Sequence, residues 1–309
     1  MPALLPTLSL FLGTALAHSH LAHIIINGNL YHGFDPRPNQ VNPADRVGWF
    51  AANTDDGFVT PAQYNTPEIV CHLSGSPPVA HAPVKAGDRI HVQWNGWPMS
   101  HVGPILSYVA PCTGTQNGCA GVTKTNLRWT KIDDSRPVFV PPSAAAPASW
   151  ATDLLIARNN SWQVQIPSNL KPGPYVLRHE IIALHFAADA NGAQNYPLCM
   201  NLYVEPPATP AANTFKLDSI DARSFYKPTD KGILFDPYQT THTTYVVPGP
   251  TVAVGATPVP HAQQVMSVSR ADGTPVVVTR GTQTVKFTSG VTVATAAPKI
   301  KGREVVREE

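Results

Sequence analysis

The chain has 309 residues, of which 43% are hydrophobic and 14% are charged, and its formal net charge at pH 7 is +2. This length allows one large domain or two small ones. So small a net charge gives no electrostatic reason to expect binding to nucleic acid or to an anionic membrane. The 32 prolines and the many short Val, Ile, Thr and Trp runs between Pro, Gly and Asn predict an all-β fold. We expect an antiparallel β-sandwich of the immunoglobulin or fibronectin-III type, with long loops and a C-terminal extension.

Residues 1–17, MPALLPTLSLFLGTALA, have the pattern of a secretory signal peptide. An apolar stretch precedes the sequence Ala-Leu-Ala at 15–17, which fits a cleavage site with small residues. The alternative, a buried N-terminal helix, is disfavoured by Pro2 and Pro6, and the segment is too short to span a bilayer. Its removal makes His18 the new N-terminus and predicts a secreted, extracellular protein.

The expected strands follow one another between loops rich in Pro, Gly and Asn. They are Leu21 to Ile26, Asp88 to Trp94, Ile105 to Ala110, Trp162 to Ile166, Tyr175 to His185 and Leu198 to Val204. Alternation in the last of them puts its apolar residues on one face. His101 lies in the loop after the second, and loops at strand ends often carry functional residues.

In the oxidising environment that secretion implies, the four cysteines predict two disulfide bonds, for which three connectivities are possible. Cys112 and Cys119 flank a loop rich in Gly, Thr and Asn and are expected to pair locally, which leaves Cys71 for Cys199. Asn159 begins the sequon Asn-Asn-Ser and is a candidate glycosylation site on a loop.

The composition changes after the last expected strand. Residues 18–250 are interpreted as one domain in which 208–250 is a packed tail, because its aromatic residues are too few for a separate core. Residues 251–309 are rich in Val, Thr, Ala and Pro and end in a charged run. This composition predicts a low-complexity tail with weak order or none.

Three polar side chains are placed to converge between Arg178 and Cys199. Gln194 and Tyr196 are two residues apart on an expected strand and therefore share a face, and His185 can close on them from the end of the preceding strand. A histidine, an amide and a phenol make a plausible polar site. The stretch itself supplies no nucleophile or strong set of metal ligands.

A mature N-terminal histidine adds an unusual ligand, because His18 would offer both its α-amine and a ring nitrogen. A further imidazole, that of His101, would complete a three-nitrogen site of the kind that suits copper. The hydroxyl of Tyr196 could occupy a weak axial position. Residue types alone support this set weakly, since a lone loop histidine is more often solvated and a tyrosine more often a core residue. His20 and His23 are interpreted as surface or strand residues and not as ligands.

Six segments follow one another over about residues 18–205: HSHLAHIIING, DDGFVTPAQYNTPEIVCH, VKAGDRIHVQW, SHVGP, WATDLLIARNNSWQVQIPSNLKPGPYVLRHEIIALH and GAQNYPLC. In this order they resemble the fungal lytic polysaccharide monooxygenases of auxiliary activity family 9, formerly glycoside hydrolase family 61. The later segment SFYKPTDKGILFDPYQ resembles an extension of longer members.

This resemblance implies a role for each matching residue. His18 and His101 would be the ligands of one copper ion, and Tyr196 its axial group. His185 and Gln194 would hydrogen-bond the oxygen co-substrate at the metal. The same two disulfide pairs are implied.

The resemblance also implies the reaction, the oxidative cleavage of β-1,4-glucan such as cellulose at C1, at C4 or at both. The co-substrate would be O2 or H2O2, and electrons would come from an external reductant or a redox partner such as a cellobiose dehydrogenase. We expect a monomer with no nucleic-acid or membrane partner. Tyr31, Tyr203 and Tyr238 are candidates to stack on the glucan, with core or linker packing as the alternative.

Two rival functions remain. A glycosidase needs two carboxylates at the scissile bond, but Glu180 lies among apolar neighbours and two residues from Arg178, which favours a structural ion pair. A non-catalytic secreted copper- or carbohydrate-binding protein could use the same scaffold. The presence of His185 and Gln194 along with the ligands favours catalysis.

Overall fold

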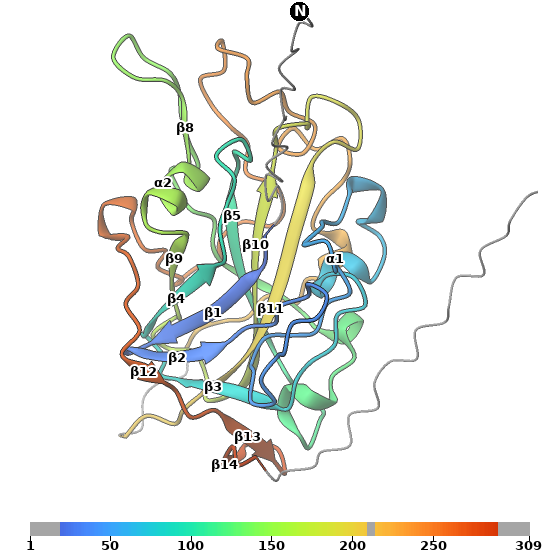
Figure 1. Cartoon of the computed structure of the whole chain (residues 1–309), viewed down its shortest axis with the longest axis vertical. Helices are drawn as coiled ribbons and strands as arrows, with labels where there is room; N and C mark the ends of the chain where they lie inside the picture. Colours follow the sequence, from blue (N-terminus) through green and yellow to red (C-terminus); the bar gives the residue numbers. More distant parts are fainter. Residues whose placement is uncertain (1–18, 209–213, 290–309) are drawn as a thin grey trace, which may run out of the picture.

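The structure, a computed structural model, describes residues 19–208 and 214–289 (Figure 1). The strands in these residues are β1 (Leu21–Ile26), β2 (Asn29–His32), β3 (Ala80–Val84), β4 (Arg89–Trp94), β5 (Ile105–Pro111), β6 (Thr130–Asp133), β7 (Phe139–Val140), β8 (Ser149–Trp150), β9 (Ser161–Gln165), β10 (Gly173–Ala183), β11 (Gln194–Val204), β12 (Ala271–Asp272), β13 (Val276–Thr279) and β14 (Gln283–Lys286).

Helices are few and short. The α-helices are α1 (Glu68–Cys71) and α2 (Ala151–Ala157), and the 3-10 helices are η1 (Pro61–Gln63), η2 (Gly118–Gly121), η3 (Lys124–Asn126), η4 (Ala222–Ser224) and η5 (His261–Gln263). In the described part of the chain, no helix has the length and apolar composition needed to cross a bilayer.

Two sheets form a sandwich, as the sequence predicted. One has the strand order β12-β2-β1-β4-β9, the other β14-β13-β3-β11-β10-β5-β6, and β7 pairs with β8 in a small hairpin. Most neighbouring strands are antiparallel, but β11 with β3 and β12 with β2 are parallel. The central pair of β10 and β11 is the longest ladder and runs through the middle of the molecule (Figure 1).

The sandwich interior is made of alternating residues from both sheets. Ile24 and Val92 enter it from one sheet, and Leu177 and Met200 enter it from the other. Leu198, Leu202 and Val204 also lie in this cluster, which confirms the predicted face of their strand. Burying such side chains, at about 25 cal/mol per Å² of apolar surface, is the main force that holds the two sheets together.

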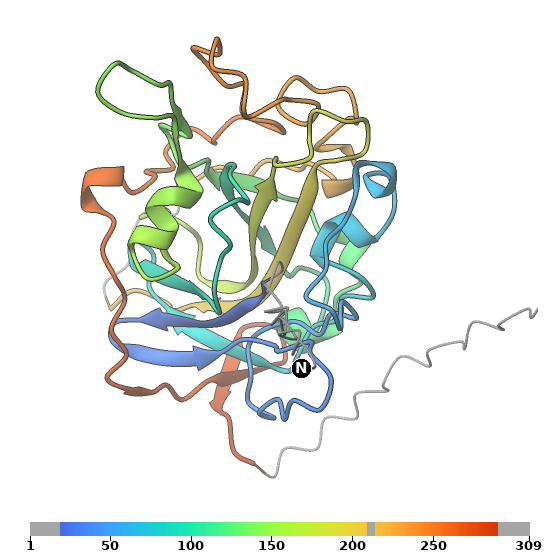
Figure 2. The ribbon, with the colours of Figure 1, turned by 45° about the horizontal axis from the view of Figure 1, so that its top comes forward.

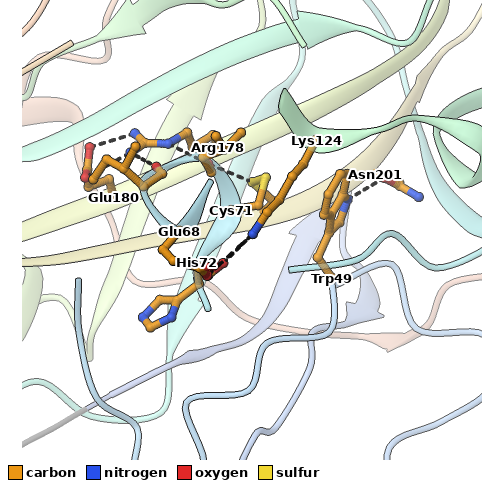
Figure 3. The surroundings of a disulfide bond; sticks show 11 residues. Trp49, Glu68, Cys71, His72, Lys124, Arg178, Glu180 and Asn201 are labelled. Atoms are coloured by element: carbon orange, nitrogen blue, oxygen red, sulfur yellow. Dashed lines mark hydrogen bonds and ion pairs between the residues drawn. A yellow bond between two sulfur atoms is a disulfide. The ribbon is translucent and has the colours of Figure 1, made fainter. Parts of the chain in front are cut away.

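The other face of β10 and β11 carries a second core. Cys71 and Cys199 are joined there, and Cys112 is joined to Cys119, so both predicted disulfides are confirmed. Figure 3 shows Arg178 and Glu180 beside the first of these bonds, with Lys124 turned toward Glu68. This second cluster links the sheet to the loops before α1.

The segment after residue 214 covers part of this second core. Phe225, Tyr226 and Ile233 lie in the cluster, and Ile220 forms an isolated bridge with Trp129. These contacts agree with a packed tail over the described part of 208–250. Residues 209–213 lie outside the described residues.

The prediction of weak order beyond residue 250 is wrong for 251–289. In Figure 2 this segment runs down one side of the molecule from η5 to β12. β12 pairs with the edge strand β2, and β13 pairs with β3. The side chain of Gln264 accepts from the backbone N–H of Gln163 (2.8 Å) and donates to its carbonyl (3.1 Å), which occupies the edge of β9. Composition could not predict this order, because the segment pairs with sheet edges that are distant in the sequence. Residues 290–309 lie outside the described residues.

Candidate functional site

The loop after β4 holds His101 by short-range contacts. The backbone N–H of His101 donates to Pro98 O (3.0 Å), and its carbonyl accepts from Nε1 of Trp97 (2.8 Å). The Ser100 hydroxyl lies 3.1 Å from Nδ1 of the ring. His101 is 6% exposed. The loop therefore fixes both the backbone and the ring.

His185 meets His101 because the β10–β5 ladder continues past the ends of the two strands. The backbone N–H groups of Ile182 and Leu184 donate to Pro104 and Val102, and these bonds hold the two loops together. The rings of His101 and His185 stack with centroids 3.8 Å apart at 27°. β10 ends at Ala183, so His185 lies in the loop and not at the strand end that the sequence predicted.

Gln194 and Tyr196 meet at the start of β11, which begins at Gln194. The Tyr196 hydroxyl donates to Gln194 Oε1 over 3.1 Å, which confirms that the two side chains share a face. Tyr196 is fully buried. Burial, with a smaller contribution from Asp55 and Asp56, raises the pKa of its phenol far above the usual value. Tyr196 is therefore a neutral phenol.

Trp97 connects the two halves of the site. Its ring makes edge contacts with His101, at a centroid distance of 6.0 Å, and with Tyr196, at 5.0 Å. Its backbone N–H donates to Asn160 Oδ1 (3.0 Å), which ties the loop to the turn before β9. Trp97 was not among the residues predicted for the site. Its position four residues before His101 was the sequence feature that could have indicated a role in the site. Only the fold shows that its ring reaches Tyr196.

One predicted ligand, His18, lies outside the described residues. Within 19–208 and 214–289, no three histidine, cysteine or acidic side chains are grouped so as to hold a metal ion. The predicted set does not require such a group, because it combines His18 with one described imidazole and a phenol. The structure thus pairs His101 with His185 and Gln194 with Tyr196, and Trp97 contacts one member of each pair.

Comparison with known proteins identifies the family. The model of auxiliary activity family 9, formerly GH61, matches residues 18–245. The chain belongs to this family.

The relatives cover most of the chain. AA9 family lytic polysaccharide monooxygenase I of Botryotinia fuckeliana is 46% identical over 242 residues, which are 78% of this chain and 86% of the relative. Lytic polysaccharide monooxygenase H of Thermothelomyces thermophilus is 46% identical over 267 residues, 85% of this chain and 73% of the relative. The extended catalytic domain of H. jecorina LPMO9A superposes with a TM-score of 0.71 at 42% identity, covering 83% of this chain and 98% of that domain.

Membership of AA9 makes this chain a lytic polysaccharide monooxygenase, an enzyme that cleaves polysaccharide oxidatively. Glu180 agrees with this, because it is fully buried and accepts two bonds from Arg178, at 2.6 and 3.0 Å. The predicted structural ion pair is confirmed. A carboxylate so enclosed has no access to a glycosidic bond, and the glycosidase alternative loses its one named acid.

Two of the three tyrosines suggested for glucan stacking are core residues. Tyr31 and Tyr203 are each 5% exposed, and the Tyr203 hydroxyl donates to Thr282 O (2.6 Å). The stacking role is therefore wrong for both. Tyr238 is 61% exposed and remains available. Asn159 is an exposed turn residue after α2, a position compatible with the predicted glycan.

Proposed function

We propose that this AA9 enzyme is secreted, binds one copper ion and cleaves β-1,4-glucan such as cellulose at C1, at C4 or at both. Mature His18 would hold the ion through its α-amine and ring, His101 through its ring, and Tyr196 would offer its phenol oxygen as a weaker donor. The observation that carries the proposal is the meeting of His101 with His185 and of Tyr196 with Gln194. The ring of Trp97, which contacts both His101 and Tyr196, connects these two pairs and supports a single site.

The residues present fit copper by the chemistry of their donors. Imidazole nitrogens suit copper, and a neutral phenol can add a weak oxygen donor to such a set. The burial that raises the pKa of Tyr196 disfavours the phenolate, which would be a stronger ligand. When bound, copper supplies the electron transfer and oxygen activation that this chain's side chains lack.

His185 and Gln194 act on the oxygen co-substrate, O2 or H2O2. Because Gln194 Oε1 accepts from the Tyr196 hydroxyl, the amide is oriented with its Nε2 as the donor. His185 is held by its stacking on His101 and can donate or receive a proton through its ring. The two groups orient the co-substrate while the metal ligands hold the ion.

The surface beside the site offers apolar contacts to a glucan chain. Phe186 is 59% exposed, and its ring lies 4.4 Å from that of His185. Met99, two residues before His101, is 80% exposed. The faces of pyranose rings carry C–H groups that pack on such side chains. An external reductant, such as a cellobiose dehydrogenase, supplies the electrons.

The test is mass spectrometry of soluble products. Mature copper-loaded protein is incubated with amorphous cellulose, ascorbate and a peroxide feed. We expect aldonic acids, 4-keto oligosaccharides or both, formed only with reductant. Native oligosaccharides formed without reductant would contradict the proposal and indicate a hydrolase. Tight one-to-one copper binding with no product from any β-glucan would indicate the binding-protein alternative.

A further inference from the structure

The first two described residues are buried, although they adjoin the predicted mature N-terminus. Ser19 is fully buried and His20 is 2% exposed. Chain ends are usually exposed unless specific contacts hold them, and buried polar groups need hydrogen-bond partners. The contacts of these two residues therefore show what holds the start of the mature chain.

Asn95 makes three hydrogen bonds to Ser19 and His20. Its Oδ1 accepts from the Ser19 hydroxyl (2.5 Å) and from the backbone N–H of His20 (3.0 Å). Its own backbone N–H donates to the carbonyl of His20 (3.2 Å). Asn95 is the first residue after β4, in the loop that carries His101. The start of the mature chain is thus bound to the same loop as a predicted copper ligand.

Asp56 holds the ring of His20 from the other side. Its Oδ1 lies 2.8 Å from His20 Nδ1, and both side chains are buried. The Oδ2 of Asp35 is 3.7 Å from Nε2 of the same ring. These contacts correct the interpretation of His20 as a surface or strand residue.

The loop of Asp56 also reaches the strand of Tyr196. Val59 forms a bridge with Asn195 on β11, and the ring of Phe58 lies 6.0 Å from that of Tyr196. Residues 19–20 are therefore tied to both described sides of the candidate site. Asn95 ties them to the His101 side, and Asp56 ties them to the Tyr196 side.

We propose that Asn95 and Asp56 are positioning residues that fix residues 19–20 so that the copper site is preorganised before the metal binds. This inference rests on the proposed function, in which the α-amine of residue 18 is a ligand. A terminus that is ordered in advance loses less conformational freedom on binding, which strengthens the binding of the metal. Asn95 and Asp56 contact the chain next to the ligand and do not themselves ligate.

The main test uses two substitutions of Asn95, which lies on an exposed loop. Asn95→Leu removes the side-chain acceptor, and we expect Cu(II) affinity to fall about tenfold or more, as for other residues that orient a ligand. Asn95→Asp keeps an acceptor oxygen and should restore most of the affinity. Asn29→Ala, at another exposed asparagine, is the matched control and should bind as the wild type does.

Two further readouts separate positioning from a loss of folding. The Cu(II) electron paramagnetic resonance spectrum should change in Asn95→Leu and return toward the wild type in Asn95→Asp. In the metal-free protein, the His20 amide should exchange its hydrogen faster in Asn95→Leu, while the melting temperature changes little.

Asp56→Asn keeps a residue type that tolerates the positive φ of 55° at this turn, and it should weaken copper binding less than Asn95→Leu.

The outcomes distinguish the two proposals. If wild type and Asn29→Ala bind copper through the N-terminus but Asn95→Leu has the same affinity and spectrum, only the positioning role is overturned. If the wild type does not bind copper through its N-terminus, the proposed function is overturned, and the positioning role with it. Weaker binding in Asn95→Leu, with rescue in Asn95→Asp, supports both.

Discussion

Strands β10 and β11 carry two polar regions that differ in how their polar groups are bonded. In their middle, Arg178 is fully buried and makes bonds to Glu180 and to the carbonyls of Ile69 and Val70. At their end, His185 stacks on the ring of His101, and Gln194 accepts a hydrogen bond from the Tyr196 hydroxyl on its own strand.

The difference separates polar groups that stabilise the fold from polar groups that we propose act in the reaction. In the middle, Arg178 also lies over the rings of Tyr108 and Phe225, and Glu180 accepts from Asn195 (2.8 Å) and from the Tyr226 hydroxyl. A buried network in which every group has partners cannot lose one member cheaply. At the end of the strands, single polar groups can change without unfolding the sandwich.

The largest expected effect is that of Arg178→Leu. It leaves the carboxylate of Glu180 buried without its cation, and loss of one partner of a buried pair costs about 3–5 kcal/mol of unfolding free energy. Urea denaturation measures this. Arg223→Leu, which breaks an exposed pair with Asp221, is the control and should change stability little. A loss below about 1 kcal/mol in Arg178→Leu, the range of surface pairs, would remove the contrast between the two regions.

Gln194→Ala should act on chemistry and not on folding. We expect the rate of oxidised product formation to fall about tenfold to a hundredfold, with Cu(II) affinity unchanged, because in the proposed function this side chain orients the co-substrate and is not a ligand. Product mass spectrometry and copper titration measure the two quantities. Gln40→Ala, on an exposed loop, is the control. Full activity in Gln194→Ala would show that this residue has no role in the reaction.

Acid should lower the free energy of unfolding through a buried histidine in the middle of β10. Burial lowers the pKa of His179 to about 3, whereas an unfolded histidine titrates near 6.5. Between these values only the unfolded chain binds the proton, so the unfolding free energy falls by about 1.4 kcal/mol per pH unit as pH decreases. His179→Phe should reduce the slope of stability against pH by that amount.

A second buried group affects the design of this experiment. Burial raises the pKa of Asp133 to about 6, so its contribution is lost as pH rises through 6 and opposes that of His179 between about 4 and 6. The slope must therefore be compared between variants. His32→Phe, at a histidine on β2 with a partly exposed side chain, is the control, and an unchanged slope in His179→Phe would refute the assignment.

The smallest expected effect is that of Tyr196→Phe. It removes one hydroxyl and its bond to Gln194, at a cost of about 0.5–1.5 kcal/mol of unfolding free energy. The paramagnetic resonance spectrum of bound Cu(II) should change if the phenol oxygen is one of its donors. Denaturation and spectroscopy test the two statements separately. A loss above about 3 kcal/mol, the range of broken buried pairs, would place Tyr196 with the stabilising network.

Local pattern predicted the sandwich strands well. β1 has the expected bounds, Leu21–Ile26, and β4, at Arg89–Trp94, shows the expected alternation of burial, because period-two alternation is a property of the segment itself. The candidate site was predicted through the ordered family segments, since residue types alone left His101 and Tyr196 ambiguous.

What could not be predicted depends on distant partners. β12 and β13 carry little burial pattern of their own and exist because β2 and β3 offer free edges. The roles of Asn95 and Trp97 likewise depend on contacts with residues 19–20 and with Tyr196. The sequence left Tyr31 and Tyr203 open between stacking on glucan and core packing, because the segment that covers them is distant: Gly273 lies against the ring of Tyr31, and Tyr203 donates to Thr282 O.

The central claim is that copper is held by the α-amine of His18 together with His101. The most direct measurement is a Cu(II) titration, with paramagnetic resonance, of the mature chain beginning at His18 and of the same chain with one alanine added before it. We predict that the added residue weakens binding on the order of a hundredfold, equivalent to about 2.7 kcal/mol, and changes the spectrum. Equal affinity and identical spectra in the two chains would contradict the claim.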